Sequence, residues 1–167
     1  INPNIVLVLM NGRPLILNWA AKYLPAIVEA WHLGTQSGHA IAQVLYGDYN
    51  PGGKLPMSFP RSVGQMPLYY NYKSTGRPGA DGEDQGSVFW SHYSDEKNTP
   101  LYPFGYGLSY SKFEYSNLKL SANSLSKNGE IKVSFTLKNT GKVAGKEVAQ
   151  LYIRDLVASS TRPVKEL

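Results

Sequence analysis

The 167-residue sequence has no cysteine, little charge and no long apolar run. The absence of cysteine excludes disulfides, cysteine-based zinc sites and cysteine nucleophiles, although it does not fix the cellular compartment. No apolar run approaches the roughly 20 residues that a membrane-spanning helix needs. Lysine and arginine always occur singly, so the net charge of +5 forms no cluster of the kind that binds nucleic acid. We therefore expect neither a nucleic-acid partner nor a membrane partner.

The composition that remains is that of a globular protein rich in tyrosine. Hydrophobic residues make up 42% of the chain and charged residues 17%, which is too apolar for a disordered segment. There are twelve tyrosines. Such side chains suit surfaces that bind carbohydrates or proteins, and they equally suit an aromatic core.

The first third of the chain alternates strand and helix signals. The apolar run Ile5–Met10 predicts a strand covered on both faces, as in a parallel sheet. A short helix over Trp19–Leu24 is expected to end before proline, and Ala26–Trp31 is a second strand candidate. A longer amphipathic helix then ends at Gly47, which suits the left-handed C-terminal position. This order predicts an α/β fold.

The stretch Gly47–Pro60, "GDYNPGGKLPMSFP", raises the question of a phosphate-binding loop. A P-loop needs G-x-x-x-x-G-K-[ST] at the start of a helix, whereas this segment follows a helix and Lys54 precedes a leucine. We reject a nucleotide site. Leu55, Met57 and Phe59 alternate with other residues, which predicts one buried face, and the prolines restrict the segment to a sheet edge or an extended crossover.

Two further catalytic patterns fail. "GTQSG", Gly34–Gly38, resembles a nucleophile elbow, but its serine is one position late. We interpret it as a glycine turn that lets helix and sheet approach closely. The three histidines are far apart and form no metal-binding motif. We expect no metal and no cofactor.

Paired carboxylates are the remaining route to hydrolysis. Asp81, Glu83 and Asp84 share a polar glycine-rich loop, as is typical of solvated turn residues. Asp95 follows Ser87–Tyr93, an aromatic stretch with β character, and is the acid best placed to touch a ligand. No pattern marks two of the acids as a catalytic pair.

The last third of the chain has a sequence pattern typical of β-strands. Three runs, Phe113–Leu120, Glu130–Asn139 and Lys146–Leu156, are separated by turn signals. Short strands at this spacing predict an antiparallel sandwich. A sandwich of this type has about seven strands, so we expect an incomplete one, with a domain boundary near Lys112.

Several motifs in order carry a family resemblance. They are "NGRPL", "AIAQVLYGDYNPGGKLPMSFPRSVGQMPLYYN", "TGRP", "PLYPFGYGLSY", "KNTGKVAG" and "RPVKEL". Together they resemble the C-terminal portion of glycoside hydrolase family 3, near its periplasmic β-glucosidase type. The resemblance covers nearly the whole chain.

The resemblance implies a fold and a division of the chain. Residues 1–72 would be the end of a multi-layer α/β sandwich, and residues 73–112 a loop-rich connector. Residues 113–167 would be the N-terminal part of a fibronectin type III-like β-sandwich. Both domains are expected to be incomplete here, so large apolar areas should be exposed around Ile5–Met10 and Ile131–Leu137.

The resemblance also implies a reaction. Family members are retaining glycosidases with an aspartate nucleophile and a glutamate acid/base, and both would precede Ile1. We therefore assign no catalytic residue here, expect the chain to be a piece of a longer one, and predict that it is inactive alone. The implied partners are a β-linked oligosaccharide or glucoside substrate, the N-terminal portion of the same enzyme and a second copy in a homodimer. The implied location is periplasmic or secreted.

Substrate contacts are predicted in "SVFWSHYSD", where a polar, aromatic strand beside a long loop could reach the sugar. The candidates are Trp90, Tyr93 and Asp95. We interpret "PLYPFGYGLSY" as structural, with a sugar-stacking platform as the alternative. For the whole protein, the alternatives to a β-glucosidase are a β-xylosidase of the same family and a non-catalytic carbohydrate-binding or scaffolding module.

Overall fold

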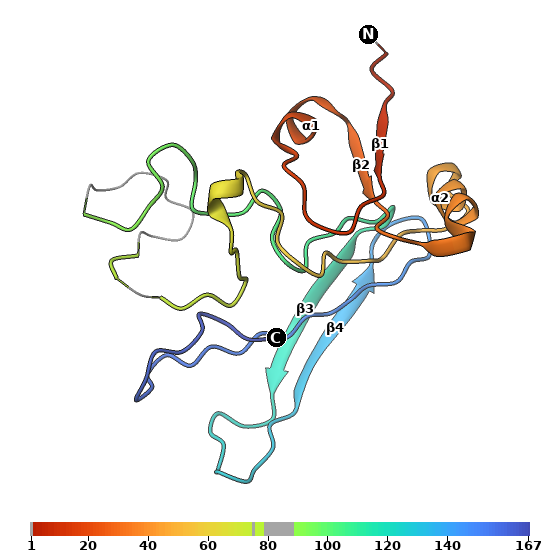
Figure 1. Ribbon diagram of the computed structural model, residues 1–167. Coiled ribbons are helices and arrows are strands. Elements are labelled where there is room, and N and C mark those ends of the chain that lie inside the picture. The colour runs from red at the N-terminus through yellow and green to blue at the C-terminus, as the bar shows by residue number, and fades with distance from the viewer. Residues whose placement is uncertain (1, 75, 79–88) are drawn as a thin grey trace. The chain divides into compact units, whose positions relative to one another are not determined.

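The computed structural model describes residues 2–74, 76–78 and 89–167, whose backbone is shown in Figure 1. The chain divides into two compact units. The first comprises Ile1–Ala42, Lys54–Gly107 and Ala149–Leu167, and the second comprises Gln43–Gly53 and Leu108–Val148. Each unit is described by itself.

The first unit opens with the predicted pair of parallel strands. Strand β1 (Val6–Leu9) lies beside β2 (Ala26–Glu29), with Val6 opposite Ala26 and Leu9 opposite Glu29 (Figure 1). The crossover between them holds helix α1 (Asn18–Tyr23). This helix ends where Leu24 turns extended, as expected for the residue before a proline. The parallel arrangement predicted from the apolar runs is confirmed.

A 3₁₀ helix (Gly34–Gln36) leads into helix α2 (Ser37–Tyr46). Gly47 follows with a φ of 86°, the left-handed position predicted for it. The interpretation of the preceding glycines is wrong in one respect. A Cβ at Gly34 or Gly38 would meet nothing within 4 Å, so close packing does not require glycine there. Gly34 is instead favoured by its φ of 70°.

The extended segment after α2 pairs antiparallel with a later stretch. The Leu55 N–H donates to the Tyr106 carbonyl at 2.8 Å, and the Phe59 N–H donates to the Tyr102 carbonyl at 2.8 Å. Pro56 lies between these two donors and Pro60 follows the second, so neither proline removes one of these hydrogen bonds. Phe59 is 1% exposed, whereas Met57 is 43% exposed. The predicted buried face is therefore wrong for Met57.

The apolar core is small. Among the described residues, its buried members are Leu17, Ala20, Ala30 and Phe59, of which Phe59 is the most deeply buried. The Trp31 ring lies 5.9 Å from the Phe59 ring, centroid to centroid, and extends this core toward the end of β2. The buried Phe59 therefore packs beside a residue that follows β2 closely in the sequence.

The second unit is built on a long antiparallel pair. Strand β3 (Phe113–Leu120) pairs with β4 (Val133–Asn139), with Phe113 opposite Asn139 and Leu120 opposite Val133 (Figure 1). The register shifts between Ser116 and Lys119, where Asn117 has a φ of 54°. Asparagine tolerates this left-handed conformation better than most residues, which explains the bulge.

Asn50 organises the turn that belongs to the second unit. Its Nδ2 donates to the Ala144 carbonyl at 2.9 Å and to Ser111 Oγ at 3.3 Å, and its Oδ1 accepts from the Tyr110 N–H at 2.8 Å. A Cβ at Gly145 would lie 2.6 Å from Asn50 Nδ2. The stretch that resembled a phosphate loop thus uses its asparagine as a structural joint.

One predicted strand is wrong, and another is not seen in the part of it that the structure describes. Lys146–Leu156 forms no strand, and its one pairing is an isolated antiparallel bridge between Ile153 and Glu166. Ser87–Tyr93 lies partly outside the described residues. In the described part, Phe89–Tyr93, only Ser91 makes an isolated bridge, with Pro78. A strand needs a neighbour along its length, and these segments meet one at a single residue.

The prediction of exposed apolar faces is confirmed. In β1 and its continuation, Val6 is 47% and Met10 56% exposed. On the β3/β4 pair, Phe135 is 44%, Leu137 41% and Leu118 70% exposed. The sequence of β4 alternates between apolar and polar residues, but neither Phe135 nor Leu137 is buried.

Candidate functional site

The predicted substrate-binding residues lie together on one surface loop of the first unit. Trp90 is 38% and Tyr93 37% exposed, and Asp95 is also exposed. Within the described part of the chain, the Asp95 carboxylate forms no hydrogen bond or ion pair, and no ring contact joins Trp90 to Tyr93. The three side chains are available to a ligand, but the structure does not bring them into contact with one another.

Asn98 fixes the shape of this loop. Its Oδ1 accepts from the Tyr93 N–H at 3.1 Å, and its Nδ2 donates to the Ser91 carbonyl at 3.0 Å. His92 Nδ1 lies 2.8 Å from the Trp90 carbonyl oxygen, a distance at which a protonated Nδ1 donates. These local bonds define the backbone on which Trp90 and Tyr93 are presented.

Gln65 anchors the far end of the loop. It is 1% exposed, and its Nε2 donates to the Lys97 carbonyl at 2.6 Å and to the Thr99 carbonyl at 3.4 Å. Its Oε1 accepts from the Arg61 N–H at 2.6 Å. Arg61 Nε also donates to the Thr99 carbonyl, at 3.0 Å. A buried amide thus ties the loop to the 3₁₀ helix Val63–Gln65.

A second group of polar residues lies at the carboxyl ends of β1 and β2. Glu29 ends β2, and its Oε1 accepts from the Trp31 N–H at 3.2 Å. Trp31 has a φ of 49°, which is rare for a bulky residue. A Cβ at Gly12 would lie 2.9 Å from His32 Nε2. In open α/β sheets, ligands bind at this edge of the strands.

Burial raises the pKa of the Glu29 carboxyl above its ordinary value. The Trp31 N–H and the Asn11 side chain act in the opposite direction and lower the pKa, but burial outweighs them. Glu29 Oε2 and Asn11 Oδ1 are both shielded from solvent and have no hydrogen-bond partner among the described residues. The Glu29 carboxyl group and the Asn11 amide therefore interact at this edge of the strands.

Three rings of the aromatic stretch Pro100–Tyr110 already contact other aromatic rings. Tyr102 and Tyr106 stack at 5.2 Å, and Phe104 stacks on Tyr70 at 4.2 Å, centroid to centroid. Tyr152 adds an edge contact to Tyr70 at 6.1 Å. Because these ring faces already meet other rings, the geometry favours the structural interpretation over a sugar-stacking platform.

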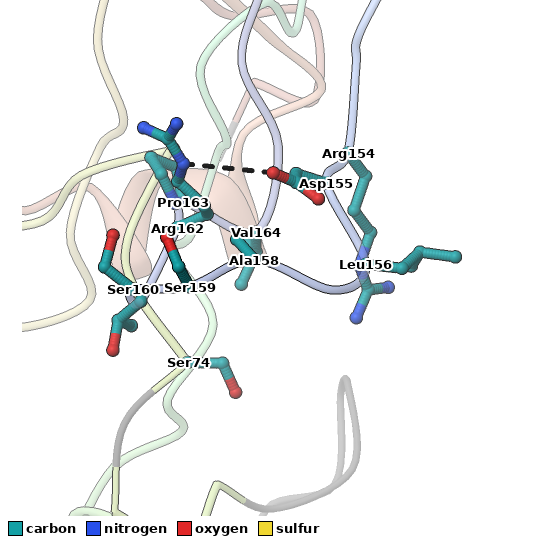
Figure 2. Close-up of a pocket in the computed structure, with 11 residues that line it drawn as sticks. Ser74, Arg154, Asp155, Leu156, Ala158, Ser159, Ser160, Arg162, Pro163 and Val164 are labelled. Atoms are coloured by element: carbon teal, nitrogen blue, oxygen red, sulfur yellow. Dashed lines mark ion pairs between the residues drawn. The ribbon is translucent and has the colours of Figure 1, made fainter.

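The segment between Arg154 and Val164 forms most of a polar hollow of about 550 Å³. Figure 2 shows the side chains that line it. Arg162 Nε lies 3.9 Å from Asp155 Oδ2 across it, and both side chains are at least half exposed. An ion pair of this kind is screened by water and contributes little to stability. None of the predicted site residues lines this hollow.

Other kinds of site are not seen in the described ranges. No three histidine or acidic side chains there are grouped so as to hold a metal ion. No helix in those ranges has the length and apolar character to cross a bilayer. Asp81, Glu83 and Asp84, which we interpreted as solvated turn residues, lie outside the described residues.

Sequence reasoning missed Gln65, Asn11 and Glu29. Nothing in the irregular stretch around Gln65 indicates that it is buried. Glu29 did carry a signal, because it is a single acid within the apolar run "AIVEAW" at the predicted end of a parallel strand.

Comparisons with known proteins give a consistent result. The sequence profile of the Glycosyl hydrolase family 3 C-terminal domain matches residues 1–110. A "Periplasmic beta-glucosidase" of Salmonella typhimurium is 52% identical over 98% of this chain and 21% of its own length. A "Beta-xylosidase" of Formosa agariphila is 48% identical over 98% of this chain and 21% of its own length.

Solved structures agree with these relatives. A β-glucosidase from Listeria innocua, in complex with gluconolactone, superposes with a TM-score of 0.90 at 47% identity. The match covers 96% of this chain and 22% of that protein. The chain therefore spans about a fifth of the length of the relatives it matches.

Proposed function

The chain belongs to glycosyl hydrolase family 3, and from that premise we propose that it is part of a retaining β-glycosidase that hydrolyses terminal β-D-glucosides. The observation that carries the proposal is the 52% identity to a periplasmic β-glucosidase, which extends over 98% of the chain. The Listeria innocua enzyme supports it, because that β-glucosidase was also solved with glucose and, as a variant, with laminaribiose.

The catalytic aspartate and glutamate are proposed to lie upstream of Ile1, in polypeptide outside this sequence. The support is that no residue here matches either catalytic motif of the family. In a retaining mechanism the two carboxyl groups stand about 5–5.5 Å apart, with one as nucleophile and the other as acid/base. This chain would then supply the scaffold and part of the sugar site, with no metal and no cofactor.

Within the enzyme, we propose that Trp90, Tyr93 and Asp95 contact the sugar. The support is their exposure on a loop whose backbone is held by Asn98 and Gln65. Aromatic ring faces pack against the C–H faces of a pyranose, and a carboxylate accepts hydrogen bonds from sugar hydroxyls.

The domain division is also a proposal. Residues 1–72 would end the α/β sandwich, 73–112 would connect, and 113–167 would begin a fibronectin type III-like domain. The β3/β4 pair supports a β domain after residue 112. The exposed apolar side chains of β4 suit a second sheet that would cover them.

A β-xylosidase is the second candidate, and the 48% identity to such an enzyme favours keeping it. The two are separated by comparing kcat/KM for aryl β-glucoside and aryl β-xyloside with the full-length enzyme. A higher value for the glucoside is expected, and a higher value for the xyloside would replace the first proposal with the second. No cleavage of either would overturn both.

Location and assembly follow from the same relatives. We propose a periplasmic or secreted enzyme, supported by the name of the Salmonella typhimurium relative. Cell fractionation tests this, and recovery in the cytoplasm would contradict it. A homodimer stays a prediction, which sedimentation of the full-length protein would test.

A further inference from the structure

The sequence contains two Asn-Gly pairs, Asn11-Gly12 and Asn128-Gly129, and the fold gives them different surroundings. Asparagine before glycine is prone to a spontaneous reaction, in which the backbone nitrogen of the glycine attacks the asparagine side chain. Glycine has no Cβ to hinder this approach, and its backbone adopts more conformations than that of other residues. The contacts of each pair therefore decide whether the attack occurs in the folded protein.

Asn128 lies in the loop between β3 and β4, which extends beyond the end of the paired strands (Figure 1). Every residue from 121 to 130 is exposed. Within the described part of the chain, the Asn128 side chain forms no hydrogen bond. Its amide can therefore rotate toward the Gly129 nitrogen without breaking a contact.

Gly129 belongs to a tight turn. Its N–H donates to the Ser126 carbonyl at 2.9 Å, and a Cβ on Gly129 would lie 2.8 Å from Ser126 Oγ, so the turn favours glycine here. The turn hydrogen bond must open before the Gly129 nitrogen can react. Because this bond lies in an exposed loop, its local opening costs little free energy. The bond therefore delays the attack without preventing it.

The turn is separate from the paired strands. At the base of the loop, the Ser121 N–H donates to the Lys132 carbonyl at 2.9 Å, and the Lys132 N–H donates to Ser121 Oγ at 2.8 Å. These bonds close the loop next to the pair of Leu120 with Val133. Opening the turn at residues 126–129 therefore leaves the pairing of β3 with β4 intact.

Asn11 has the same glycine neighbour, but its side chain is held. Its Nδ2 donates to the Arg13 carbonyl at 2.5 Å, and its Oδ1 is shielded from solvent. The amide also interacts with the Glu29 carboxyl group. Rotation toward the Gly12 nitrogen would break these contacts, and separating a shielded polar group from its partners is costly. On the other side, a Cβ on Gly12 would lie 2.9 Å from His32 Nε2.

We propose that Asn128 is a site of spontaneous deamidation in the folded protein and that the fold protects Asn11. The Gly129 nitrogen forms a bond to Asn128 Cγ, the Cγ–Nδ2 bond breaks, and Nδ2 leaves as ammonia with the proton that the Gly129 nitrogen gives up. Water then opens the resulting succinimide ring at either carbonyl carbon, which yields aspartate or isoaspartate. The inference does not rest on the proposed function.

The test incubates the full-length protein at mildly alkaline pH, which favours loss of the proton from the backbone nitrogen. Samples are digested at acidic pH, where the reaction is slow, and mass spectrometry follows the replacement of NH₂ by OH in the peptides that contain Asn11 and Asn128. Asn123 is the internal control, because it is exposed in the same loop but precedes serine. A parallel sample in concentrated urea reports the rates without the fold.

The ratio of the Asn128 rate to the Asn11 rate in the folded protein is divided by the same ratio in urea, so that effects of neighbouring residues cancel. This corrected ratio should be at least about ten, which corresponds to a barrier difference of about 1.4 kcal/mol. Asn123 should react more slowly than Asn128, because the serine side chain hinders the attack. Chromatography should separate both aspartate and isoaspartate forms of the Asn128 peptide.

Two results would overturn the proposal. A corrected ratio near one would show that the contacts of Asn11 give it no protection. An intact Asn128 in the folded protein, at a time when the sample in urea has reacted, would show that the Gly129 turn or another part of the full-length enzyme blocks the attack.

Discussion

The Gln150 side chain occupies the space next to Gly105 where any other residue would place its Cβ. Gln150 Nε2 donates to the Gly105 carbonyl at 3.0 Å, and a Cβ built on Gly105 would lie 2.1 Å from Gln150 Oε1. Gly105 also has a φ of 79°. Two separate constraints therefore select glycine in the middle of the aromatic stretch of the first unit.

Gly105→Ala should destabilise the protein by about 1–3 kcal/mol through its backbone conformation alone, with displacement of Gln150 in addition. The change is measured by urea unfolding. Gly53→Ala is the control, because a Cβ there meets nothing within 4 Å. In the double variant with Gln150→Ala the crowding is removed, so the two losses should be less than additive. Additive losses would show that Gln150 does not determine the choice of glycine.

Gln65→Leu should loosen the loop that carries the proposed sugar contacts. Leucine leaves the Lys97 carbonyl and the Arg61 N–H without their buried partner, at about 1–3 kcal/mol for each group that stays unpaired. Hydrogen exchange in the Phe89–Thr99 segment should accelerate more than in β3. Unchanged exchange in that segment would contradict the anchoring role of Gln65.

Asn50→Asp tests the joint in the second unit. The carboxylate keeps the acceptor for the Tyr110 N–H but loses the donors to Ser111 and the Ala144 carbonyl. We expect a loss of about 1–3 kcal/mol on thermal unfolding. Asp48→Asn, at an exposed neighbouring position, should have a much smaller effect. Equal effects would mean that charge, and not the Asn50 contacts, matters.

Asp95→Asn in the full-length enzyme should lower kcat/KM for a β-glucoside by about tenfold, which corresponds to about 1.4 kcal/mol of transition-state stabilisation. The reason is that an amide accepts fewer hydrogen bonds from sugar hydroxyls than a carboxylate does. Ser94→Ala in the same loop is the control. Wild-type kinetics for D95N would remove Asp95 from the sugar site.

The strands that were predicted correctly coincide with apolar or alternating runs in their own sequence. β3 matches the run "FEYSNLKL" residue for residue, and β1 and β2 lie within their apolar runs. The run Lys146–Leu156 has a similar pattern but pairs only at Ile153. Whether an alternating segment becomes a strand depends on a neighbour that its own sequence does not specify.

The candidate site was predictable in part for a related reason. The exposure of Trp90, Tyr93 and Asp95 follows from a polar loop sequence. The meeting of Asn11 with Glu29 depends on the register that sets Leu9 opposite Glu29, and the burial of Gln65 depends on carbonyls more than 30 residues away. Such contacts belong to tertiary structure, and no local pattern encodes them.

The most direct test of the account is β-glucoside hydrolysis by three samples: the full-length enzyme, this 167-residue chain alone, and the chain mixed with the remainder of the enzyme. The full-length enzyme should release glucose with retention of the anomeric configuration, the chain alone should show no turnover, and mixing should restore activity. Robust turnover by the chain alone would contradict the claim that its bond-cleaving carboxyl groups lie elsewhere.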